Sequence, residues 1–124
     1  IHNLEYDGIV EPEGLDGKPE VVVELENLKA VNDSLVLCKF SKAHMTNERY
    51  EELLSCSYEE IQTYGERIVE LERHFNNQRG FDRGDDTLPF ELDGFEAALD
   101  EYYELRGWND DGTVPAEPSA SAAD

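Results

Sequence analysis

The sequence predicts an all-α fold, a compact bundle of roughly four helices with a long acidic loop and a disordered C-terminal tail. Apolar residues recur at helical spacing in several stretches, and residue types that cap helices stand at the expected ends of those stretches. The run Val21–Val23 is the one strand-like feature and is too short to change this prediction. With 124 residues, the chain is long enough for one domain with a modest core.

The first helix is expected from Pro19 to about Lys39, after an irregular acidic lead-in. Proline fits the first helical position, and Glu20 lies where the positive end of the helix dipole favours an acid. Apolar residues then follow at helical spacing, at positions 21, 22, 25, 28, 31 and 35.

Two further helices are expected in the middle of the chain. Thr46 or Asn47 can cap a short helix that ends at Leu54. Ser57 and Glu60 have the spacing of a capping box, which predicts the start of a long helix.

A polar, acidic connector at residues 81–92 separates the long helix from the last one. We expect the long helix to close at Gly80 in the left-handed conformation. Asp93 and Glu96 have the spacing of a second capping box, and Gly107 is expected to end the helix that follows.

These elements divide the chain into three parts. Residues 1–18 form the lead-in, residues 19–114 the helical domain, and residues 115–124 a Pro/Ala/Ser-rich tail that is expected to be disordered. The chain starts with Ile1 rather than methionine, which suggests a piece of a longer protein.

The overall charge excludes several classes of partner. Thirty Asp and Glu against ten Lys and Arg give a net charge of −20. This balance argues against nucleic-acid and membrane partners, and the sequence lacks an apolar run long enough for a membrane span. We therefore expect a cytoplasmic protein. The acids are spread along the whole chain, which is typical of a halophilic protein that stays soluble in strong salt.

One segment departs from this acidic pattern. Between Asn27 and Asn47 the only acid is Asp33, whereas three lysines lie in the same window, at positions 29, 39 and 42. The local net charge is therefore +2, and the window contains Cys38. Such a window is either chance in a small sample or a site for an anionic group beside the cysteine.

The two cysteines cannot form a metal centre alone. Cys38 and Cys56 are 18 residues apart and do not form a CxxC pair. Zinc and iron–sulfur sites generally need four ligands, so further ligands would have to come from elsewhere. In a reduced cytoplasm, each cysteine is most often a small buried apolar residue.

Three ordered stretches resemble a known family. The segment DSLVLCKF at residues 33–40 resembles the D-x-x-G-L-C motif in the C-terminal region of aldehyde ferredoxin oxidoreductases. The helix and loop that follow in that family resemble GERI, LER, FN, RGFDR and DDTLP at residues 65–68, 71–73, 75–76, 79–83 and 85–89. The closing helix resembles LDEYYELRGW at residues 99–108.

The resemblance implies an oxidoreductase that converts aldehydes to carboxylic acids and passes electrons to ferredoxin. It implies a tungsten or molybdenum bis-pterin and a [4Fe–4S] cluster in the intact enzyme, with Cys38 as one cluster ligand and Asp33 and Leu37 at the pterin. The partners implied are the N-terminal domains of the same enzyme, ferredoxin and the aldehyde. The chain holds no catalytic residue of its own, so alone it is expected to be inactive and without cofactors.

Two points qualify what the motif implies. On an ideal helix Asp33 and Cys38 would lie about 140° apart, so we expect the helix to break between Leu35 and Lys39. Val36 stands where the motif has glycine. An alternative interpretation is a non-catalytic electron-transfer or assembly subunit, or a scaffolding module, that docks on a catalytic chain.

Overall fold

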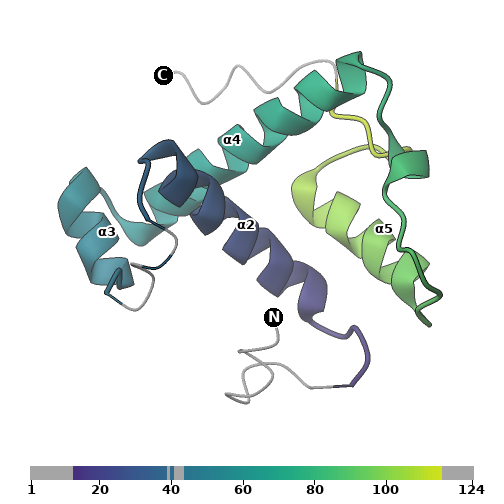
Figure 1. The fold of residues 1–124 in the computed structure, drawn as a ribbon, viewed down its shortest axis with the longest axis horizontal. Helices are drawn as coiled ribbons and strands as arrows, with labels where there is room; N and C mark the ends of the chain where they lie inside the picture. Colours follow the sequence, from purple (N-terminus) through teal and green to yellow (C-terminus); the bar gives the residue numbers. More distant parts are fainter. Residues whose placement is uncertain (1–12, 39, 41–43, 116–124) are drawn as a thin grey trace.

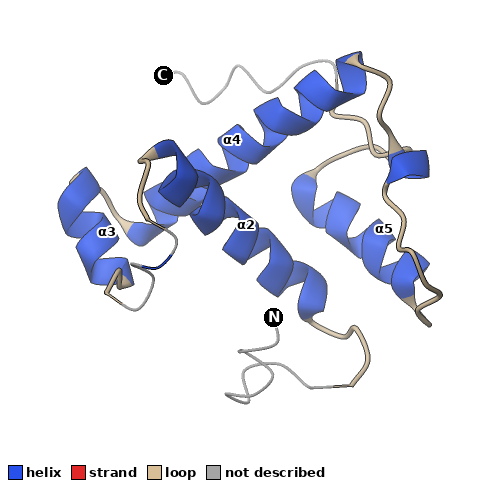
Figure 2. Ribbon diagram, viewed as in Figure 1, coloured by secondary structure: helices blue, strands red, loops and turns tan. Residues whose placement is uncertain are grey.

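A computed structural model describes residues 13–38, 40 and 44–115. These ranges contain four α-helices, one short 3-10 helix and no strand, which confirms the all-α prediction (Figure 2). The elements in chain order are α2 (Lys18–Ser34), α3 (Asn47–Leu54), α4 (Tyr58–Gln78), η2 (Arg83–Asp85) and α5 (Phe95–Arg106). None of the helices in the described ranges is long and apolar enough to cross a bilayer.

Helix α2 is the central element of the bundle. It crosses the long helix α4 and contacts α5 along its other side, while the short helix α3 packs on α4 (Figure 1). The core lies where α2, α3 and α4 meet and is centred on the buried residues Val31, Tyr50 and Ile61. Partly buried apolar residues pack around these three: Leu28, Leu35, Leu37, Met45, Leu54, Cys56 and Ile68.

The crossing of α2 and α4 is close because α4 carries a glycine there. A Cβ atom added to Gly65 would lie 2.6 Å from the Cα atom of Asn27 on α2. The buried Asn27 side chain donates a hydrogen bond to Gln62 of α4 at 3.1 Å and accepts one from Arg106 of α5. Asn27 therefore links three helices at a single point.

Most of the predicted helix ends are confirmed. The Thr46 hydroxyl accepts a hydrogen bond from the Arg49 N–H, and Ser57 and Glu60 form the expected capping box. Gly80 has the expected left-handed conformation, with φ of 92°.

Two predicted helix ends were wrong. Helix α2 ends at Ser34 rather than near Lys39. Helix α5 begins after Gly94, which has φ of 79° and no side-chain cap, so Asp93 lies one residue too early to cap it. Glu96 makes an ion pair with Arg83 at 2.8 Å instead of closing a capping box.

A cluster of charged and aromatic residues holds the acidic connector against α4 and α5. The Arg73 guanidinium donates to the Gly112 carbonyl at 2.7 Å and to the Asp86 carboxylate at 2.9 Å, and it lies over the Trp108 ring. Tyr103 also donates to Asp86. Burial works to raise the pKa of Asp86, but these hydrogen bonds outweigh it, so the pKa lies below its usual value.

Candidate functional site at the end of helix α2

The C-terminal end of α2 is closed by a Schellman turn. The N–H of Val36 donates to the Asp33 carbonyl at 3.0 Å, and the N–H of Leu37 donates to the Asn32 carbonyl at 3.1 Å. These are the two hydrogen bonds that define a Schellman turn. The Leu37 side chain packs in the same core cluster as Val31, which is the apolar contact that often accompanies such a turn. The helix therefore breaks ahead of Cys38, and the expected break in this region is confirmed.

The residue in the left-handed position of this turn is Val36. Its φ is 55°, a conformation that a β-branched residue adopts only at a cost and that glycine adopts freely. The positive φ of this turn explains locally why the D-x-x-G-L-C motif of the family has a glycine at this position. The Val36 side chain is 90% exposed, so it gains little from burial.

We predict that Val36→Gly stabilises the domain by about 1 kcal/mol. Relief of the left-handed strain is worth roughly 1–2 kcal/mol, and the extra freedom of glycine in the unfolded chain offsets part of it. Urea unfolding followed by circular dichroism measures the change. The control is Val21→Gly inside α2, which should lose roughly 1 kcal/mol. Equal destabilisation by both variants would contradict the explanation.

The three predicted site residues, Asp33, Leu37 and Cys38, differ in their exposure at this turn. Cys38 and Asp33 are exposed, and Asp33 forms an ion pair with Lys29 one turn earlier on α2. Leu37 is half-buried and packs against the core. Lys39 and Lys42, the other two lysines of the positive window, lie outside the described residues.

Two polar residues that the sequence did not single out support the turn. The Asn32 amide donates to the Leu37 carbonyl at 3.4 Å, and the Tyr50 hydroxyl of α3 donates to the Asn32 side chain at 2.6 Å. An asparagine within the apolar spacing of a helix is the one signal that could have pointed to this support. The backbone next to Cys38 is thus tied to both α2 and α3.

The two cysteines have different surroundings. Cys56 is half-buried against the core, and burial raises the pKa of its thiol, with Glu60 and Glu51 adding to the effect. A thiolate, the form that binds metals, is therefore disfavoured at Cys56. Cys38, by contrast, is exposed.

The donor set around Cys38 is incomplete for a metal centre. Within the described part of the chain, no group of three or more His, Cys, Asp or Glu side chains is placed to hold a metal ion. A single exposed thiol at a fixed turn is suited to complete a centre whose other ligands come from elsewhere.

An apolar groove of about 690 Å³ lies at the other end of α2. It is formed by the first turns of α2, the connector and α5, and its apolar wall includes Leu88, Leu92, Phe95 and Leu99. Helix α2 has 17 residues and is therefore about 25 Å long. The groove thus belongs to a different part of the molecule from Cys38.

The fold is a small all-α domain, and Cys38 is exposed directly after a fixed turn. Residues 3–120 match the family described as aldehyde ferredoxin oxidoreductase, domains 2 & 3, and the chain belongs to that family. The tungsten-containing aldehyde ferredoxin oxidoreductase of Pyrococcus furiosus is 33% identical over 123 residues, covering 82% of this chain and 20% of that protein. The protein of the same name from Thermococcus kodakarensis is 31% identical, with the same coverage.

The chain therefore spans about a fifth of the length of the curated relatives that it matches. No solved structure matches the chain. The stretches that carry the family resemblance fall into two places in the fold. Residues 33–40 contain the turn at Cys38, whereas Arg73, Asp86 and Tyr103 from the later stretches form the cluster that holds the connector.

Proposed function

We propose that the chain acts as the C-terminal domain of a longer tungsten- or molybdenum-dependent aldehyde ferredoxin oxidoreductase, with residues 19–114 as its folded part. Such an enzyme oxidises an aldehyde to a carboxylic acid and passes the electrons to ferredoxin. In this proposal Cys38 supplies one thiolate ligand of a [4Fe–4S] cluster, and Asp33 and Leu37 contact the adjacent pterin. The domain is inactive alone because the other ligands lie outside it.

The observation that carries this proposal is the exposed Cys38 directly after a closed turn. The turn is held by backbone hydrogen bonds and by the packing of Leu37, so the direction of the chain at Cys38 is defined before any cofactor binds. A preorganised ligand loses less conformational freedom on binding a metal than a ligand on an irregular loop.

Asp33 fits a contact with the pterin through its chemistry. An ionised carboxylate is an acceptor only, and it suits the N–H groups of a pterin ring. Its ion pair with Lys29 is exposed on both sides, and such pairs contribute little to stability, so Asp33 can exchange this partner at low cost. When bound, the cluster supplies electron transfer and the pterin-bound metal supplies the oxidation of the aldehyde.

Iron analysis of the holoenzyme tests the assignment of Cys38. We predict that Cys38→Ser lowers the iron content and removes the visible absorbance of the cluster, because a serine hydroxyl is a poor ligand for iron. Cys56→Ser is the matched control and should keep both. Far-UV circular dichroism of each variant separates loss of the cluster from loss of the fold.

The alternative function makes a different prediction for the same variants. A scaffolding or assembly subunit would not use Cys38 as a ligand, so Cys38→Ser would retain its iron and its absorbance. That result, with the fold intact, would remove the ligand role of Cys38 from the proposal. Measuring tungsten in Asp33→Asn then shows independently whether the pterin contact remains.

A further inference from the structure

A stripe of exposed apolar residues runs along α4. Tyr64, Leu71 and Phe75 lie on one face of this helix and are 50%, 64% and 54% exposed. Their spacing of seven and four residues places them along one side. An apolar stripe on a helix is normally turned to the core, so this face is the kind of surface that a further protein segment covers.

The charge pattern of α4 sets this face apart from the rest of the chain. From Tyr64 to Gln78, the face holds residues 64, 67, 68, 71, 74, 75 and 78, and none of them is Asp or Glu. Of the three acids in this part of the helix, Glu66 and Glu70 lie on other sides, whereas Glu72 borders the face and lines a shallow pocket with Leu71 and Phe75. In a chain with 30 acids, an acid-free face is unlike the solvated surface and matches the depletion of acids in interfaces.

One residue on the same side of α4 as the stripe packs in the core next to the turn that precedes Cys38. Ile68 lies on the same side of α4 between Tyr64 and Leu71, and it packs against the core cluster that also receives Leu35 and Leu37. Val36 in that turn and Phe40 after it are almost fully exposed, and the sequence from residue 34 to residue 47 contains no acid. The acid-free face of α4 and the turn that precedes Cys38 are therefore linked through one core cluster.

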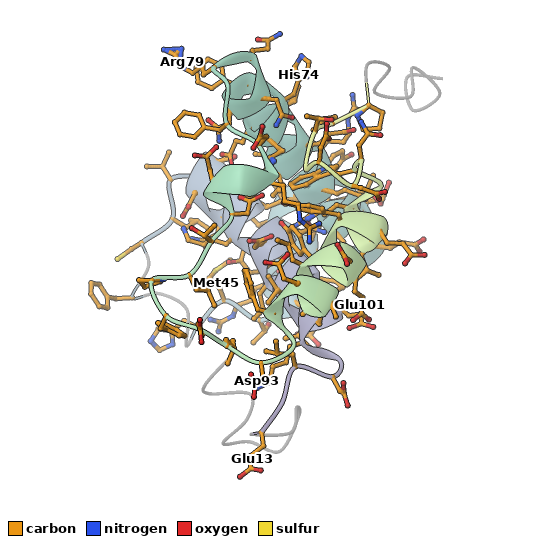
Figure 3. All side chains as sticks on the ribbon, turned by 90° about the vertical axis from the view of Figure 1, so that its right-hand side faces the viewer. Glu13, Met45, His74, Arg79, Asp93 and Glu101 are labelled. Atoms are coloured by element: carbon orange, nitrogen blue, oxygen red, sulfur yellow. The ribbon has the colours of Figure 1, made fainter. Side chains whose placement is uncertain are left out.

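The C-terminal half of the stripe projects beyond the helix packing. Figure 3 shows His74 and Arg79 at the end of α4 that lies farthest from Glu13. The Arg79 guanidinium lies 4.8 Å from the centre of the Phe75 ring, which leaves the rest of that half-exposed side chain open to a partner.

We propose that Tyr64, Leu71 and Phe75 extend the surface through which this domain packs on the cofactor-bearing part of the same enzyme. The inference rests on the proposed function. The chain spans about a fifth of the length of its relatives, so a large partner of the same polypeptide is available to cover the stripe. Its contact surface is expected to be apolar and, facing Arg67 and Arg79, to carry acids at its edge.

Cysteine labelling of the holoenzyme tests this surface. Leu71→Cys should react with a maleimide at least about tenfold more slowly than Leu105→Cys, because a packed interface excludes the reagent. The domain alone gives the opposite order, since Leu71 is 64% exposed and Leu105 on α5 only 41%. Mass spectrometry of the labelled peptides separates these sites from Cys38 and Cys56, and Phe75→Cys repeats the test at a second position.

Labelling of Leu71→Cys and Phe75→Cys as fast as Leu105→Cys would overturn the proposal. Protection that disappears on dilution would also overturn it, because that behaviour indicates a second copy of the enzyme. The labelling rates of Leu71→Cys and Phe75→Cys do not depend on whether Cys38 binds iron. Protection together with retained iron in Cys38→Ser would therefore reject the ligand role of Cys38 and leave the packing surface in place.

Discussion

Arg106→Ala is expected to destabilise the domain by roughly 3 kcal/mol, because its charged side chain is buried among specific partners. The side chain is only 1% exposed. Its guanidinium pairs with Glu26 at 2.8 Å, donates to the buried Asn27 side chain, and lies over the Tyr102 ring. Removing it leaves the buried Asn27 oxygen without its charged donor, which is the costly part of such a change.

Urea unfolding of the variant and of a matched control measures this effect. Arg67→Ala removes an exposed arginine from α4 and should change the free energy of unfolding by at most about 0.5 kcal/mol. Arg106→Met keeps most of the apolar stem, so it separates lost packing from lost pairing. If Arg106→Ala unfolds at the same urea concentration as Arg67→Ala, the buried network does not hold α5 on α2.

This network could not be predicted from the sequence. Arg106 and Asn27 are 79 residues apart, and neither lies in a local sequence pattern that indicates a hydrogen-bond partner elsewhere in the chain. The ends of α3 and α4 were predictable because their signals lie within three residues of each other, as Ser57 and Glu60 do. Short-range sequence signals therefore predicted the positions of most helices, whereas the contacts between helices depend on how the chain packs.

The turn at Cys38 shows where local rules fail and why. A left-handed helix end is expected at glycine, and Gly80 and Gly107 follow that rule. Val36 has the same positive φ although valine disfavours it, because the packing of Leu37 and the hydrogen bonds of the turn hold the backbone there. Asp93 does not cap α5 because the N-cap position is occupied by Gly94, which has a left-handed conformation and no side chain to accept a hydrogen bond.

Candidate site residues were accessible from the sequence only through the family motif. Composition and spacing indicated an anionic site near Cys38, but an ideal helix would have pointed Asp33 and Cys38 about 140° apart. Asn32 and Tyr50, which support the turn, were found in the structure alone. Their contribution depends on α3 folding back on α2, a contact that no single segment encodes.

Gly65→Ala is expected to destabilise the domain by about 2 kcal/mol, although alanine is the better helix former by about 1 kcal/mol. The added methyl group would lie 2.6 Å from the Cα of Asn27, so a backbone rather than a flexible side chain stands in its way. Helices α2 and α4 must then move apart, which weakens the Asn27–Gln62 hydrogen bond. Thermal and urea unfolding of the variant measure the loss.

The matched control for Gly65→Ala is Glu66→Ala, which changes the neighbouring exposed residue and should stay within about 0.5 kcal/mol of the parent. A stabilised Gly65→Ala would mean that helix propensity outweighs the close crossing, and the packing of α2 on α4 would have to be looser than described. The crossing also bears on the candidate site. Because α2 ends at the turn that precedes Cys38, a shift of α2 on α4 moves that turn relative to Ile68 in the shared core cluster. Under the proposed role of Cys38 as a cluster ligand, Gly65→Ala should therefore weaken iron retention in the holoenzyme, which Glu66→Ala should leave unchanged.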